Sequence, residues 1–181
     1  MTEANSSDEK QTVIKLQDLD TSLQEEISKI PGCEKLMLCF QCGTCSADCP
    51  VGRHLNEYKP RLIAMMTKLG MKQALFQGDL LWLCTQCYTC LERCPQNVEL
   101  AEIISALRGI AAREGYLHPS LKKVIEALAN HGYIYEITEF IEEDREMREL
   151  PPVPKVNIGE VRKIMRMTGI DKLVGIELEE D

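Results

Sequence analysis

The organisation of this chain is decided by Cys39-Phe-Gln-Cys42-Gly-Thr-Cys45-Ser-Ala-Asp-Cys49-Pro50 and by its repetition, Cys84-Thr-Gln-Cys87-Tyr-Thr-Cys90-Leu-Glu-Arg-Cys94-Pro95. Both stretches read C-x2-C-x2-C-x3-C-P, with a glutamine and a threonine at matching places. Eight of the nine cysteines fall in this repeat. The odd count, the regular spacing and the absence of a secretory signal pattern at the N-terminus favour metal binding over a disulfide framework.

The spacing indicates iron–sulfur clusters. A C-x2-C-x2-C loop can place three thiolates around one [4Fe–4S] cube, and in two-cluster ferredoxins the cysteine before the proline ligates the other cube. The spacing also allows each motif to serve a cube of its own. With the crossing, one cluster is predicted on Cys39, Cys42, Cys45 and Cys94, and the other on Cys84, Cys87, Cys90 and Cys49.

Zinc is the alternative metal, because structural zinc sites also use CxxC pairs. A C-x2-C-x2-C run followed by a Cys-Pro ending is typical of ferredoxins and seldom serves zinc, so the pattern favours iron. Cys33, the ninth cysteine, lies outside the repeat. It is interpreted as a small buried apolar residue without a ligand role.

The fold class is expected to be mostly α, because apolar residues recur at helical spacing and strand alternation is scarce. Gly70 is expected to end one helix and Asn97 to cap another. Pro50 and Pro95 each suit the first turn of a helix or a tight exit from the cluster, and the helices that follow are expected to point their N–H groups toward the clusters. Residues 1–20 are expected to be disordered at their start and weakly structured toward their end. Helices are predicted at about 21–30, 62–69, 71–76, 100–110, 120–132, 137–149 and 161–167.

Three parts are expected along the chain. Residues 1–30 form an N-terminal extension, 31–132 the cluster domain, and 133–181 a C-terminal extension with helices and prolines for subunit docking. The formal net charge of -8 argues against nucleic-acid binding. No apolar run approaches the ~20 residues that span a bilayer, so the protein is expected to be cytoplasmic. Catalytic triad, P-loop and dinucleotide patterns are missing, which favours a relay with no catalytic residue of its own.

The string Leu80-Leu-Trp-Leu-Cys-Thr-Gln-Cys-Tyr-Thr-Cys-Leu-Glu-Arg-Cys-Pro95 is more specific than the motifs alone. Together with the first motif and with Arg108-Gly-Ile-Ala-Ala-Arg-Glu-Gly115, it resembles the iron–sulfur C subunit of heterodisulfide reductase over about residues 33–130. The resemblance implies an α-helical ferredoxin with two [4Fe–4S] clusters.

The resemblance also implies a function. In that family a soluble complex of methanogens passes electrons from a flavin-containing A subunit through the C subunit to a catalytic B subunit, which carries CCG motifs. The catalytic B subunit reduces the coenzyme M–coenzyme B heterodisulfide in methanogenesis, and hydrogenase or formate dehydrogenase subunits feed the flavin subunit in larger assemblies. Because this chain has no CCG motif, the disulfide chemistry is expected on the partner.

Two other functions fit the same motifs. One is a relay subunit of a related oxidoreductase with another substrate, and the other is a free ferredoxin-type carrier. The long segments before Cys39 and after Cys94 favour the role of a complex subunit, because a free carrier needs neither segment and both can supply docking surfaces.

Overall fold

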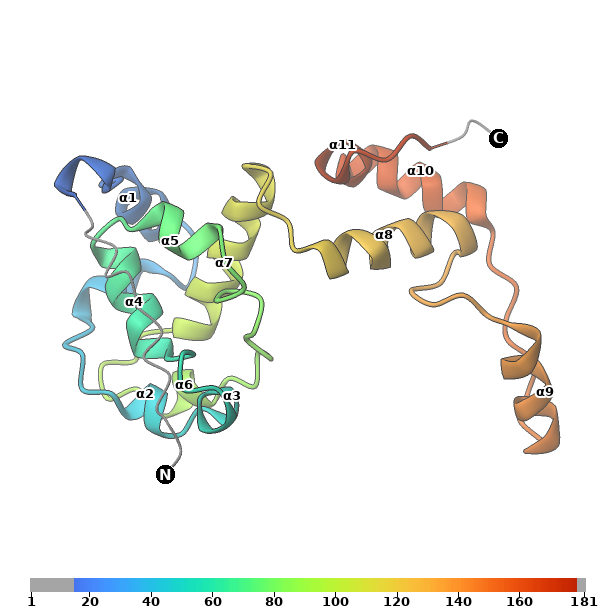
Figure 1. Cartoon of the computed structure of the whole chain (residues 1–181), viewed down its shortest axis with the longest axis horizontal. Helices are drawn as coiled ribbons and strands as arrows, with labels where there is room; N and C mark the ends of the chain where they lie inside the picture. Colours follow the sequence, from blue (N-terminus) through green and yellow to red (C-terminus); the bar gives the residue numbers. More distant parts are fainter. Residues whose placement is uncertain (1–14, 179–181) are drawn as a thin grey trace, which may run out of the picture. The chain divides into compact units, whose positions relative to one another are not determined.

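The computed structural model describes residues 15–178, and within this range every regular element is a helix (Figure 1). The chain divides into two compact units. The first comprises the residues up to Gly78 together with Thr85–Ile103. The second comprises Asp79–Cys84 together with the residues from Ile104 onward. In residues 15–178 no helix is long and apolar enough to cross a membrane.

The first unit is an assembly of short helices. Figure 1 shows α2 and α6 side by side, and α4 begins next to them, where the Arg61 N–H donates to the Ser46 hydroxyl at 3.0 Å. Short 3-10 turns lie at Leu16–Asp18 and Glu34–Leu38. The helices are α1 (Ser22–Ser28), α2 (Thr44–Ala47), α3 (Pro50–His54), α4 (Pro60–Lys68), α5 (Lys72–Phe76), α6 (Thr89–Glu92) and the first turn of α7 (Leu100–Arg113).

Apolar side chains from these helices form the core of the first unit. Leu23 and Ile27 of α1, Ile63 of α4, Leu75 of α5 and Ile103 of α7 are completely buried. Burying one such side chain stabilises a fold by about 1.5–3 kcal/mol. The core therefore begins at α1, within residues that the sequence assigns to an N-terminal extension. That three-part division stays a prediction, and residues 1–14 lie outside the described range.

The start of α1 is anchored to the end of α4. Gly70 follows α4 with a φ of +69°, as predicted for a helix stop, and its carbonyl accepts the Asp20 N–H at 2.7 Å. A Cβ atom at Gly70 would overlap the Asp20 carbonyl group. Lys72 Nζ lies 3.4 Å from the Asp20 carboxylate. The Ser22 hydroxyl, and to a smaller extent Lys72, lower the pKa of Asp20.

The second unit contains the rest of α7, then α8 (Pro119–His131), α9 (Glu139–Met147), α10 (Ile158–Thr168) and α11 (Ile170–Val174). Helices α8 and α10 pack against each other (Figure 1). Arg162 Nε joins them by donating to the Ala129 carbonyl at 3.1 Å. Gly132 ends α8 with a φ of +73°.

Each predicted helix is present, and one prediction about their ends is wrong. Asn97 does not cap a helix: it has a φ of +52°, and α7 begins only at Leu100. Pro95 enters a turn, the second of the two exits expected for these prolines, and the Asn97 N–H closes this turn onto the Cys94 carbonyl at 3.1 Å. Pro50, in contrast, occupies the first turn of α3 as predicted.

Candidate iron–sulfur site

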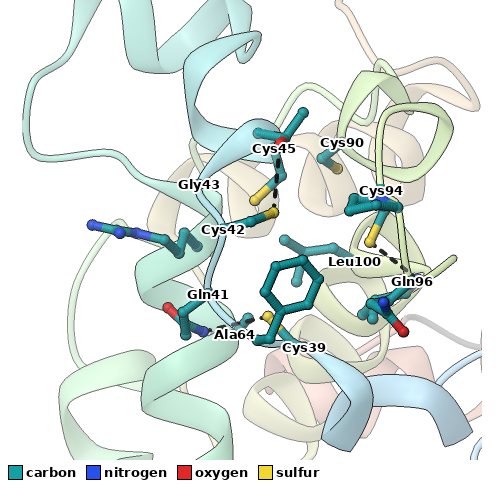
Figure 2. A pocket seen from close by; sticks show the side chains of 15 residues that line it. Cys39, Gln41, Cys42, Gly43, Cys45, Ala64, Cys90, Cys94, Gln96 and Leu100 are labelled. Atoms are coloured by element: carbon teal, nitrogen blue, oxygen red, sulfur yellow. Dashed lines mark hydrogen bonds between the residues drawn. The ribbon is translucent and has the colours of Figure 1, made fainter.

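A cysteine-lined pocket lies in the first unit. The sulfur atoms of Cys39, Cys42, Cys45 and Cys94 point toward a common space in Figure 2, and Cys90 also contributes to the lining. The pocket encloses about 410 Å³ of space free of atoms, part of which is open to solvent. The cysteine that ends the second motif therefore lies with the three that begin the first.

The two motif loops repeat the same backbone conformation. Gln41 and Gln86 both have positive φ, at 63° and 50°. Two residues later, Gly43 and Tyr88 again have positive φ and directly precede the helical turns α2 and α6. These left-handed residues turn each C-x2-C-x2-C loop, and α2 packs against α6. The repeat in sequence is thus a repeat in structure.

A threonine hydroxyl contacts the second cysteine of each motif. The Cys42 thiol and the Thr44 hydroxyl are hydrogen-bonded at 3.4 Å, and so are Cys87 and Thr89 at the same distance. These contacts lower the pKa of Cys42 and that of Cys87. Burial raises the pKa of Cys45. A lower pKa favours the thiolate, the form of cysteine that binds metal.

Backbone N–H groups point at the sulfurs that end each motif. The Gly52 N–H donates to Cys49 Sγ at 3.4 Å, and the Val98 N–H donates to Cys94 Sγ at 3.3 Å. The bond to Cys49 needs a residue without a side chain, because a Cβ atom at Gly52 would lie 2.9 Å from the Tyr58 carbonyl oxygen. Such donors stabilise the negative charge of a ligating thiolate and tune its cluster.

The first predicted ligand set is brought together, since Cys39, Cys42, Cys45 and Cys94 all line the pocket. The second set is Cys49, Cys84, Cys87 and Cys90. Of these, Cys49 and Cys90 are buried, Cys84 is half-buried and Cys87 is exposed. Cys84 belongs to the second compact unit and the other three to the first. This set stays a prediction.

The donor set of the pocket fits a four-iron cluster. All nine cysteines, which lie between residues 33 and 94, carry free thiols. Within residues 15–178, no three His, Cys, Asp or Glu side chains are grouped around a position for one metal ion. That is compatible with the pocket, because a cube of four irons holds its cysteines farther apart than a single zinc with Zn–S bonds of about 2.3 Å.

Cys33 lies outside the pocket. Its side chain is completely buried, as the sequence predicts. Burial, together with the charges of Glu34, Glu102 and Glu99, raises the pKa of Cys33 to about 11. The thiol is therefore protonated at neutral pH and behaves as a small apolar side chain.

Two cations contact the motif loops and were missed by sequence reasoning. Lys68 Nζ donates to the Cys39 carbonyl at 3.0 Å. The Arg108 guanidinium donates to the carbonyls of Leu81 at 2.8 Å and of Cys84 at 2.5 Å. Arg108 is the first residue of the segment Arg108–Gly115 that resembles the C-subunit family. Nothing in the sequence indicates the carbonyl groups to which its guanidinium donates. No sequence signal marks Lys68.

Comparison with known proteins supplies the family. Residues 35–98, which contain both motifs, match the 4Fe-4S dicluster domain. The chain is 34% identical to the iron–sulfur C subunit of the CoB–CoM heterodisulfide reductase of Methanopyrus kandleri, over 93% of this chain and 94% of that protein. It is also 34% identical to the C subunit of the H2:CoB–CoM heterodisulfide,ferredoxin reductase of Methanothermobacter thermautotrophicus, with the same coverage of both proteins.

A third relative comes from Methanosarcina mazei. The C subunit of the ferredoxin:CoB–CoM heterodisulfide reductase of Methanosarcina mazei is 31% identical over 83% of this chain and 98% of its own length. The dicluster match and these relatives assign two [4Fe–4S] clusters to the chain and make it an electron-transfer subunit of an oxidoreductase complex. This chain therefore belongs to the family of iron–sulfur C subunits of heterodisulfide reductase.

Proposed function

We propose that this chain relays electrons from a flavin-containing subunit to a catalytic subunit with CCG motifs, which reduces the heterodisulfide of coenzyme M and coenzyme B in methanogenesis. One-electron transfer is the chemistry that a [4Fe–4S] cluster supplies when bound. The chain's own residues hold the clusters and direct backbone N–H groups at the ligating sulfurs. Hydrogenase or formate dehydrogenase subunits supply electrons to the larger assembly, and the complex works in the cytoplasm.

The observation that carries this proposal is the length of the similarity. Relatives named as C subunits of CoB–CoM heterodisulfide reductases match 93% of this chain, whereas the dicluster domain alone covers only residues 35–98. The similarity therefore includes segments on both sides of the cluster motifs. A free carrier has no need of these segments, but a protein that contacts several partners in a complex does.

For the clusters we propose an α-helical ferredoxin arrangement with crossed ligation. Cys94 lines one pocket with the first three cysteines of the first motif, which supports its assignment to their cluster. By the symmetry of the repeat, Cys49 completes the cluster of the second motif. The ligands are then Cys39, Cys42, Cys45 and Cys94 for one cluster, and Cys84, Cys87, Cys90 and Cys49 for the other.

We further propose that residues 133–181 serve subunit docking. Exposed apolar side chains occur along this segment, with Phe140 75% and Met147 79% exposed at the two ends of α9 and Met167 78% exposed on α10. Large apolar side chains exposed in such number are typical of surfaces that a partner covers.

The experiment is an anaerobic pull-down of the full chain from its source cells, with the partners identified by mass spectrometry. We expect a flavoprotein and a CCG-motif protein in fixed ratio, and reduction of the coenzyme M–coenzyme B heterodisulfide by the isolated complex. If a flavoprotein co-purifies with a different catalytic subunit, the relay function is supported and the proposed heterodisulfide substrate is contradicted. Recovery of the chain alone, with its clusters intact, would contradict the proposal and favour a diffusing carrier.

A further inference from the structure

Each cysteine motif has one cation bonded to the backbone of its first cysteine. Lys68, the last residue of α4, donates to the carbonyl of Cys39 at 3.0 Å, and the contact is partly buried. Arg108, in the middle of α7, donates to the carbonyl of Cys84 at 2.5 Å, also in a partly buried contact. Cys39 and Cys84 occupy the same position in the two copies of the repeat. The two cations are therefore equivalent in position although they come from different helices.

The contact of Arg108 is the more extensive of the two. Its Nε donates to the Leu81 carbonyl at 2.8 Å, and a terminal nitrogen donates to the Trp82 carbonyl at 3.2 Å. The guanidinium also lies 5.8 Å from the centroid of the Trp82 ring, within the range of a cation–π contact. Arg108 thus fixes the whole segment that leads into Cys84, because a guanidinium presents several donors in one rigid plane. Lys68 fixes Cys39 through one of its three donors.

A cation at this place has an electrostatic consequence. Reduction adds one negative charge to a [4Fe–4S] cluster, and a fixed positive charge nearby stabilises that extra charge. The stabilisation is larger in a partly buried contact than in water because the local dielectric constant is lower. A positive charge bonded to the carbonyl of a ligating cysteine therefore raises the reduction potential of the cluster that this cysteine holds.

We propose that Lys68 and Arg108 are paired positioning residues, each of which anchors the first cysteine of one motif and raises the potential of one cluster. The pairing lets the two potentials be set separately within a duplicated site. A lysine with one bond sits at the first motif, and an arginine with three carbonyl partners sits at the second. The proposal rests on Cys39 and Cys84 being ligands of different clusters.

The test compares matched variants of the full chain, purified anaerobically. Lys68→Met and Arg108→Met remove the charge and the donors while keeping a long side chain. Lys72→Met is the control, because Lys72 is a partly buried lysine whose ammonium pairs with the Asp20 carboxylate. Iron and sulfide content is measured first, and then the two midpoint potentials by a redox titration followed by electron paramagnetic resonance.

We expect each of the two methionine variants to lower a different midpoint. The expected change in the ratio of reduced to oxidised cluster at a fixed potential is about three- to tenfold, where tenfold equals about 59 mV for one electron. The other midpoint should move less, and Lys72→Met should move neither. Lys68→Arg and Arg108→Lys should keep the potentials close to those of the unchanged chain, because they retain the charge.

Three results would overturn the proposal. Both methionine variants could lower the same midpoint, they could leave both midpoints unchanged, or the charge-retaining variants could shift the potential as much as the methionine variants do. If a methionine variant loses iron, the charge-retaining variant decides: full iron content with a near-normal potential supports the proposal, and the same loss of iron contradicts it. A failed pull-down would leave these outcomes unaffected, so the two proposals fail separately.

Discussion

At the scale of single residues, the two motif loops adopt the same backbone conformation with different residues at one position. Both loops need a left-handed residue directly before their helical turn, and it is Gly43 in the first and Tyr88 in the second. Glycine adopts this conformation without a steric penalty, whereas for other L-residues it costs roughly 1–2 kcal/mol. The second loop therefore carries a strain that the first does not.

This difference predicts how the stability of the chain responds to substitution at the two positions. Gly43→Ala should lower the stability of the anaerobic, cluster-loaded chain by about 1–2 kcal/mol, because alanine is disfavoured at a φ of +87°. The neighbouring Arg61 side chain is 3.9 Å from the new Cβ, so the loss is one of backbone conformation. Tyr88→Gly should be more stable than Tyr88→Ala by about 1–2 kcal/mol, because both variants lose the tyrosine side chain and only alanine keeps the left-handed penalty. Thermal unfolding of the three variants checks this, and equal stability of Tyr88→Gly and Tyr88→Ala would contradict it.

Cys33 predicts a dependence of stability on pH. Its pKa is raised in the folded chain from an ordinary value of 9.0 to about 11, mainly by burial. A thiol whose pKa is raised by folding stabilises the folded state while it stays protonated, so this contribution is complete below about pH 9 and is lost as the pH rises through about 11.

The stability of the cluster-loaded chain is therefore expected to fall between about pH 9 and pH 11, and that of Cys33→Ala is expected to fall less steeply. Denaturant unfolding at several pH values measures both slopes. Cys33→Ala should also keep the full iron content of both clusters. Parallel slopes in the two proteins, or the loss of a cluster, would show that Cys33 has another role.

At the scale of elements, the junction between α4 and α1 fixes two helices of the first unit to each other. Gly70 ends α4, and its carbonyl receives the Asp20 N–H just before α1. The approach is so close that a Cβ atom at Gly70 would overlap the Asp20 carbonyl. Both the positive φ and the contact exclude any side chain at this position.

Gly70→Ala is expected to lower stability by more than about 2 kcal/mol, because the left-handed penalty of roughly 1–2 kcal/mol adds to the overlap with Asp20. Gly78→Ala is the control, since a Cβ atom there meets nothing within 4 Å and its φ is not positive. Thermal unfolding and partial proteolysis near α1 measure the difference. Similar stability of the two variants would disprove the constraint.

At the scale of the whole molecule, the two motifs depend on each other. Cys94 comes at the end of the second motif but lines the pocket of Cys39, Cys42 and Cys45. If ligation crosses, neither motif can complete a cluster alone, and the segment between them fixes the distance that their loops must span. The duplicated sequence then makes one cooperative site rather than two independent ones.

Crossed ligation predicts which spectroscopic signal each cysteine variant affects. Cys94→Ser should perturb the same electron paramagnetic resonance signal as Cys42→Ser and leave the signal affected by Cys87→Ser largely intact. Cys49→Ser should do the reverse. The three comparisons use the reduced, anaerobic full chain, which should otherwise contain about eight irons and eight sulfides. A shared signal for Cys94→Ser and Cys87→Ser would refute the crossing.

Much of the helical pattern was accessible from the sequence because it follows from local spacing. The apolar periodicity of α7 and α8 and the stop at Gly70 reflect interactions between residues a few positions apart. The backbone conformation that follows the second motif could not be predicted in this way, although the two motifs are similar in sequence. Pro50 opens α3, whereas Pro95 enters a turn that closes at Asn97, and a Cys-Pro ending is compatible with both exits.

The sequence by itself determined the cofactor class, the helical fold class and the family, because these depend on cysteine spacing, periodicity and similarity along the chain. The tertiary structure alone decided which groups surround each cysteine. It placed Cys94 in the pocket of the first motif, Lys68 on the carbonyl of Cys39 and Arg108 on the carbonyl of Cys84. Each of these contacts joins residues more than twenty positions apart, and no local pattern encodes such a distance. Only the packing of complete helices brings these groups together.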